Sequence, residues 1–320
     1  MSGPLADLSY RHYADGVVND RAWWAIARNG FRGTVKKKGF WVLTAMSSWW
    51  YAVVLVMVYV FEQIAANSIR QQAQDRAVDF ISSITWNRVI LDGVSFGQIF
   101  YLFLALMAGA GAIANDNRTN ALLVYLSKPC TKMDYLIGKW LGVFLPLVLA
   151  MLLPQVGFFF YGAMSYHDYG FLRQDPWLVL KLPLLAMIMA AFYTSIVLGM
   201  SSLFNQGRLA GAISAAIYFI TNFFTVLLGG IIAAGASMES STTVSTPLKL
   251  AFYGSVDGIM IATAKGILGE DQGGLPLGGP QNNLSVPALP LWVPLLFSLV
   301  VAGLLLFLAH ARVRAVEVVK

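Results

Sequence analysis

The sequence predicts an all-α polytopic membrane protein, and its composition and long apolar segments both favour this class. Of its 320 residues, 58% are hydrophobic and only 12% are charged. A soluble globular domain is about half apolar and a quarter charged, so this chain has too few polar side chains to cover a globule in water. Lipid offers the backbone no hydrogen-bond partners, and the apolar segments are therefore expected to be helices.

Six segments meet or approach the ~20 apolar residues that cross a hydrocarbon core. They are residues 40–61, 94–113, 140–164, 179–204, 209–236 and 291–308. The fourth and fifth segments are separated only by residues 205–208, Asn-Gln-Gly-Arg, which predict a tight turn. The chain is thus divided into an N-terminal segment, 1–39, and a six-helix transmembrane domain, 40–320.

Residues 247–269 are moderately apolar but are not predicted to form a seventh span. They include Lys249, Asp257 and Lys265, and each charge costs about 2.5–3.5 kcal/mol at a helix centre. We expect one or two interfacial helices here, lying on the external face before the last span. The Gly- and Pro-rich residues 273–290 are expected to form a loop.

The distribution of charge predicts the orientation. With the N-terminus inside, the cytoplasmic segments carry 15 of the 22 Lys and Arg and 6 of the 16 Asp and Glu, a net charge of +9. The external segments carry the remainder, a net charge of −3. Cytoplasmic loops of membrane proteins carry an excess of Lys and Arg. The basic balance is therefore interpreted as a topology signal, with both termini inside, and nucleic acid is not an expected partner.

Residues 21–35 are expected to form an amphipathic elbow helix at the level of the lipid headgroups. At 100° per residue, apolar side chains gather on one side and basic ones on another: Trp23, Trp24, Ala27 and Phe31 against Arg21, Arg28 and Arg32. Such a helix suits the inner leaflet. A surface anchor without any protein partner is an equally good interpretation of these residues.

The connection between the second and third spans predicts a short helix, residues 119–126, at the cytoplasmic mouth of the bundle. Leu122, Leu123 and Leu126 form its apolar stripe, and Pro129 ends it. Thr131 and Asp134 then form a capping box that starts the third span. Such a helix, held between two spans, can transmit a push; an ordinary loop with a fragment of helix is the alternative.

The sequence lacks the motifs of several catalytic classes. It has no GxxxxGK[ST] phosphate-binding loop, so ATP is not expected to bind in a Walker-type site of this chain. The three histidines lie in separate segments and there is one cysteine, Cys130, so no metal site is expected. The predicted spans contain no central charged residue, which argues against a proton- or sodium-coupled carrier.

Trp49, Trp50 and Tyr51 fall in the middle of the first span, although Trp and Tyr prefer the membrane interfaces. Two interpretations stay open. They pack against a neighbouring helix, or they line a wet or lipidic groove in which the polar ring atoms find a partner.

Residues 116–142, DNRTNALLVYLSKPCTKMDYLIGKWLG, resemble the permease subunits of ABC-2-type transporters. The leucine run, the Ser-x-Pro and the apolar segment ending in Gly-Lys follow the family pattern, whereas Asp116 stands where Glu is usual and Asn120 interrupts the expected Gly-Thr. The resemblance implies an exporter in which two permease chains pair and each contacts a separate ATPase subunit that binds ATP and Mg. It also implies coupling contacts at Arg28, Asp116, Arg118, Leu122, Leu123 and Leu126.

The leading hypothesis is therefore a non-catalytic permease subunit in a bacterial cytoplasmic membrane, with lipid, an ABC ATPase and a second permease chain as its partners. A membrane anchor or mechanical transmitter, which links an ATPase to an external protein without moving cargo, is the second hypothesis. A membrane-embedded sensor or scaffold is the third.

Overall fold

The computed structural model describes residues 22–67, 71–119, 121, 131–166, 170–238, 251–270 and 289–312. Every regular element within these ranges is a helix, as the composition predicts. In chain order they are α1 (Ala22–Val35), α2 (Lys38–Ser47), α3 (Trp49–Asn67), α4 (Gln71–Ser82), α5 (Trp86–Gly109), α6 (Ala114–Thr119), α8 (Lys132–Ser165), α9 (Phe171–Gln174), α10 (Leu178–Leu203), α11 (Gly207–Met238), η1 (Ala251–Gly254), α13 (Val256–Leu268) and α14 (Trp292–Arg312).

Six helical segments of the described chain are long and apolar enough to cross a membrane, which confirms the predicted fold class. They are Trp49–Asn67, Trp86–Thr119, Lys132–Ser165, Leu178–Leu203, Gly207–Leu228 and Trp292–Arg312. Each overlaps a predicted span, and the second and third begin eight residues before the predicted start. The reason is that hydropathy detects only the apolar part of a helix, whereas the helix continues into polar residues at its ends.

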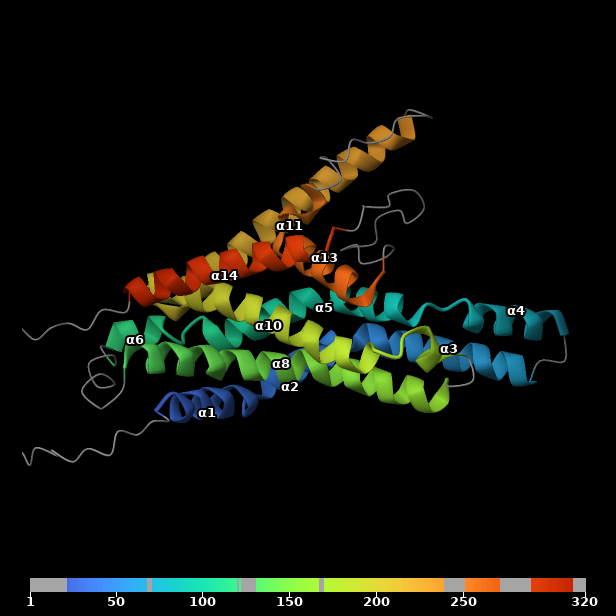
Figure 1. Ribbon diagram of the computed structural model, residues 1–320, viewed down its shortest axis with the longest axis horizontal. Helices are drawn as coiled ribbons and strands as arrows, with labels where there is room; N and C mark the ends of the chain where they lie inside the picture. The colour runs from blue at the N-terminus through green and yellow to red at the C-terminus, as the bar shows by residue number, and fades with distance from the viewer. Residues whose placement is uncertain are drawn as a thin grey trace, which may run out of the picture.

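The spans run along the long axis of the molecule (Figure 1). Helices α1 and α6 and the C-terminal turns of α14 lie at one end, which we name the α1 end, and α4 lies at the other, which we name the α4 end (Figure 1). Helix α10 occupies the centre and contacts α5, α8, α11, α13 and α14. Helix α11 leans away from the bundle as it leaves the α1 end (Figure 1).

The first predicted span, 40–61, is not a continuous helix. It divides at Ser48 into α2 and α3, and only α3 is long enough to count as a span. The hydroxyls of Thr44, Ser47 and Ser48 each donate a hydrogen bond, 2.6–2.8 Å long, to a carbonyl three or four residues earlier. Such bonds compete with the hydrogen bonds of the helix and bend it, whereas hydropathy alone predicts one continuous span.

Helix α13 does not lie on the surface as the interfacial helix that we expected. All of its residues except Val256 and Gly266 are buried, and it contacts α5, α10, α11 and α14. Its ends are formed as local chemistry predicts: the Ser255 hydroxyl accepts from the amide of Gly258 at 2.9 Å, and Gly269 ends the helix with φ +74°. The helix is short, and the neighbouring spans enclose it.

The burial of α13 brings a carboxylate among the spans. The Tyr218 hydroxyl donates to Oδ2 of Asp257 at 2.6 Å, and the Tyr193 hydroxyl lies 3.3 Å from Oδ1. Tyr193 also lies 3.2 Å from Oε1 of Gln98, whose amide donates to the backbone carbonyl of Asp257. The charge that argued against a seventh span is thus accommodated by polar side chains of α5, α10 and α11.

Candidate functional site

Helix α1 is held against α8 by glycines. A Cβ on Gly30 would lie 3.0 Å from the Cα of Gly142, and a Cβ on Gly138 would lie 2.7 Å from the backbone oxygen of Trp23 and from Ile26. Neither position has room for a side chain, so the two backbones approach as closely as small residues permit. The N-terminal helix is therefore packed on the bundle along its length rather than attached by its ends alone.

The corner between α5 and α6 is fixed by one hydroxyl of α10. The Ser201 hydroxyl accepts from the backbone amides of Ile113 and Ala114, at 3.1 and 3.0 Å, and donates to the carbonyl of Ala110 at 2.9 Å. Both acceptor positions and the one donor of this buried hydroxyl are used. The chain thus turns out of α5 at a position that α10 determines.

Helix α6 is also tied to α8, through Asp116. The Lys139 ammonium lies 2.7 Å from Oδ2 of Asp116, and the Tyr135 hydroxyl donates to the same oxygen at 2.8 Å. At the start of α8, the predicted capping box is confirmed: the Thr131 hydroxyl accepts from the amide of Asp134, whose carboxylate accepts from the amide of Thr131. Asp116 therefore joins the element after α5 to the element that begins the next span.

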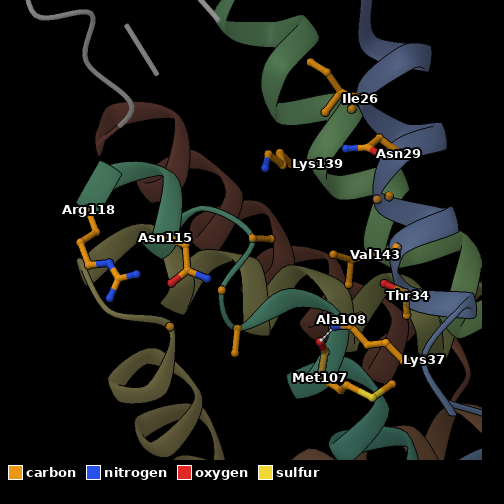
Figure 2. A pocket seen from close by; sticks show the side chains of 18 of the residues that line it. Ile26, Asn29, Thr34, Lys37, Met107, Ala108, Asn115, Arg118, Lys139 and Val143 are labelled. Atoms are coloured by element: carbon orange, nitrogen blue, oxygen red, sulfur yellow. Dashed lines mark hydrogen bonds between the residues drawn. The ribbon is translucent and has the colours of Figure 1, made fainter. Parts of the chain in front are cut away.

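A pocket of about 910 Å³ opens between these elements at the α1 end. Its walls come from α1, the α5–α6 corner, the first turns of α8 and the turn between α10 and α11. Figure 2 shows Arg118 and Asn115 of α6 on one side and Lys139 of α8 with Asn29 of α1 on the other. On the α1 side, the Lys37 ammonium donates to the carbonyl of Met107 at 3.2 Å (Figure 2).

Two glycines also bring the α5–α6 corner close to the start of α11. A Cβ on Gly207 would lie 2.8 Å from the Cα of Gly111. Gly207 and the small residues that end the second span appear in the sequence as separate stripes of small residues, and the structure packs them against each other. The pocket thus lies between two close backbone contacts, α1 on α8 and the α5–α6 corner on α11.

The residues predicted to contact an ATPase are only partly brought together. Asp116 and Arg118 lie on α6, and Arg118 lines the pocket. Arg28 is exposed on α1 and is not among the described lining residues. Leu122, Leu123 and Leu126 lie outside the described residues. The coupling role of all six side chains stays a prediction.

The three aromatic residues of the first span lie against α5. The Trp50 indole donates to the carbonyl of Val89 at 3.2 Å, and the buried Tyr51 hydroxyl lies 3.4 Å from the carbonyl of Ile90. The Trp49 ring is 42% exposed and contacts Phe96 edge to face. For Trp50 and Tyr51 this geometry agrees with the packing interpretation; the lining of a groove stays a prediction.

The comparison with family models gives a match over residues 24–314, to the model described as "ABC-2 family transporter protein". The match covers all six spans and begins within α1.

The chain belongs to this family.

It is therefore a multi-pass membrane component of an ABC-type transporter, and the family resemblance at residues 116–142 is confirmed. The search of individually curated proteins finds no match. In this ABC-2 protein, three features of the α1 end escaped sequence reasoning: the role of Ser201, the glycine contacts between α1 and α8, and the pocket. Nothing in the sequence distinguishes Ser201 as the partner of the α5–α6 corner, because serines near helix ends are common. The glycines at positions 138 and 142 are four apart, a spacing that predicts close helix contact, but their partner helix was not predictable.

Proposed function

We propose that this chain is the permease subunit of an ATP-driven exporter in the cytoplasmic membrane, with a separate ATPase subunit as its motor. The family match over residues 24–314 is the observation that carries the proposal. The ATPase binds and hydrolyses ATP with Mg, and this chain binds neither. A second permease chain completes the translocation pathway.

The architecture of the α1 end supports a mechanical role. Helix α1 is packed on α8, and α6 is joined to α8 by Asp116 and to α10 by way of the Ser201 hydroxyl. A displacement applied to the segment after α5 is therefore passed to two spans at once. Coupling in proteins travels through such packed and hydrogen-bonded elements.

Export of a substrate and transmission of force to an external protein share this coupling step. The exposed surfaces of α3, α11 and α14 carry large apolar side chains, Val56, Phe223 and Leu299 among them. Such surfaces face lipid or a second permease chain, and an exporter needs both. The matching family is described as a transporter family, which favours export over force transmission.

The test uses the chain and its ATPase expressed together, and measures the ATPase that co-purifies with the permease. Leu123→Asp is expected to lower the recovered ATPase about tenfold or more, because burying one leucine is worth about 1.5–3 kcal/mol and 1.4 kcal/mol is a factor of ten. Membrane insertion is expected to be unchanged, because Leu123 lies outside every predicted span.

The matched control is Val78→Asp, which introduces the same charge at an exposed apolar position of α4, at the opposite end. It is expected to leave the recovered ATPase unchanged. Hydrolysis of ATP by the purified chain alone, or equal recovery with Leu123→Asp and Val78→Asp, contradicts the proposal.

A further inference from the structure

The pocket at the α1 end gathers four basic side chains from four separate segments of the chain. Lys37 precedes α2, Arg118 lies in α6, Lys139 lies in α8, and Arg208 lies in the first turn of α11. The described residues that line the pocket include no acidic side chain. Asp116 does not line the pocket, but its carboxylate pairs with Lys139 and so offsets one of the four positive charges. The cavity therefore retains a net positive charge.

The chemistry of the lining predicts an oxyanion as the ligand. Guanidinium and ammonium groups are donors without acceptors, and the side-chain amides of Asn29, Asn115 and Gln206 add further N–H donors. The ammonium of Lys37 has three donors, of which the Met107 carbonyl takes one. Charged donors of this kind bind phosphate more strongly than neutral donors do.

The size of the pocket and its other lining residues indicate that the ligand carries an apolar group as well as a phosphate. A volume of about 910 Å³ exceeds that of a phosphate alone and lies at the upper end of the range for small-molecule sites, about 300–1,000 Å³. Beside the cations and the polar side chains, the wall includes the apolar and small residues Met107, Ala108, Ala110 and Val143. A phosphodiester with a glycerol and the first methylenes of an acyl chain fits both kinds of wall.

The position of the pocket selects a membrane lipid as the source of that phosphate. The pocket is lined by α1 from Ile26 to Thr34 and by the ends of the spans, and the exposed indole of Trp41 lies close to it. The Trp41 indole donates to the carbonyl of Val35, two residues before the pocket-lining Lys37. Trp side chains are enriched at the level of the headgroups, so the exposed Trp41 indole indicates that the pocket lies near this level, where a lipid phosphate reaches it without leaving its leaflet.

We propose that this pocket binds the phosphate group of an anionic phospholipid. The bound headgroup bridges α1, α6, α8 and the start of α11, so the lipid strengthens the contact between the N-terminal helix and the segment after α5. This site requires the membrane environment alone and does not depend on the ATPase assigned under the proposed function.

The experiment measures lipid binding to the full-length chain in detergent, by native mass spectrometry and by the apparent melting temperature. The probes are dioleoylphosphatidylglycerol, the zwitterionic dioleoylphosphatidylcholine, and inorganic phosphate. We expect saturable binding of phosphatidylglycerol, little binding of phosphatidylcholine, and weak competition by inorganic phosphate. The competition arm separates recognition of the phosphate from recognition of the whole lipid.

Two double variants remove the same charge at different places. Arg118→Gln with Arg208→Gln is expected to weaken phosphatidylglycerol binding about tenfold or more, because charged donors bind phosphate more strongly than neutral donors do. Arg76→Gln with Arg173→Gln, at exposed sites away from the pocket, is expected to leave it unchanged. Arg118→Lys with Arg208→Lys retains the charges and is expected to recover part of the affinity.

Three results overturn the proposal. Equal binding of the two lipids means that the pocket does not select an anionic headgroup. Binding of inorganic phosphate without binding of phosphatidylglycerol assigns the pocket to a soluble phosphate. If the two glutamine double variants lose lipid equally, or neither loses it, Arg118 and Arg208 do not bind the lipid and serve another partner, such as an acidic segment of a protein. Because Arg118 and Arg208 are exposed, the glutamine variants are expected to fold, and the melting temperature without lipid checks this.

Discussion

The carboxylate of Asp257 lies among the spans, where an ionisable group without partners is costly. The structure gives it Tyr218 and Tyr193 as hydroxyl partners, and the Tyr218 contact is the shorter at 2.6 Å. Four helices, α5, α10, α11 and α13, meet around this one side chain. At the scale of the residue, the hydrogen bonds of this buried polar cluster thus hold α13 against its neighbours.

Replacing Asp257 with alanine is expected to destabilise the protein. The buried Tyr218 hydroxyl would lose this acceptor, and a buried polar group left without a partner costs about 1–3 kcal/mol. A loss of 1 kcal/mol corresponds to roughly 2–4 °C in domains of 150–250 residues, so a decrease of several degrees in the melting temperature is expected. Asp257→Asn keeps an acceptor oxygen and is expected to have the smaller effect.

The control for this measurement is Asp79→Ala, which removes an exposed carboxylate from α4. Its melting temperature is expected to stay within a degree or two of the parent, since exposed substitutions usually change stability by about 0.5 kcal/mol or less. If Asp257→Ala and Asp79→Ala have the same melting temperature, the cluster does not stabilise the packing of α13.

At the scale of the element, the contact between α1 and α8 depends on the absence of side chains at Gly30, Gly138 and Gly142. The sequence shows α1 as an amphipathic helix, and that pattern alone allows it to float on the membrane surface. The structure instead places Ala27 of α1 in a fully buried position. The N-terminal helix is therefore part of the packed bundle.

Gly138→Leu is expected to displace α1 from α8, because the added Cβ would lie 2.7 Å from backbone and from Ile26. The readout is labelling by a membrane-permeant maleimide at Ala27→Cys, in a background where Cys130 is serine. We expect slow labelling with the native glycine and labelling faster by about tenfold or more with Gly138→Leu. Gly33→Leu is the matched control, since a Cβ there meets nothing within 4 Å; equal labelling in the two leucine variants would refute the docking of α1.

At the scale of the whole molecule, an even number of spans predicts that α1 and the end of α14 lie on the same side of the membrane. Figure 1 agrees, since α1 and the C-terminal turns of α14 share one end. The charge split of +9 and −3 predicts that this end faces the cytoplasm. The predicted orientation would also place the basic pocket in the cytoplasmic leaflet, where anionic lipids attract basic residues.

A membrane-impermeant maleimide on intact cells tests this orientation. In the Cys130→Ser background, Ser82→Cys at the end of α4 is expected to be labelled from outside, because α4 lies at the opposite end from α1. Arg312→Cys, at the end of α14, is expected to be labelled only after the membrane is permeabilised. The reverse pattern would invert the topology, and labelling of both from outside would contradict a bundle of six spans.

The sequence by itself determined the features that depend on local composition and spacing. The helical class and the six spans follow from apolar length, because lipid leaves helices as the way to satisfy the backbone. The capping box of Thr131 and Asp134 was predictable for a similar reason, because its two residues lie three apart and need no other part of the chain.

Tertiary structure alone decided the features that join distant segments. The sequence shows Lys37, Arg118, Lys139 and Arg208 as four unrelated charges, and folding places them around one pocket. It shows the first residue of a Ser-Ser pair, Ser201, as an ordinary helical serine, and folding makes it the hydrogen-bond partner of the α5–α6 corner. These outcomes depend on which helix faces pack together, and that choice is made by close packing and the pairing of buried polar groups across the whole bundle.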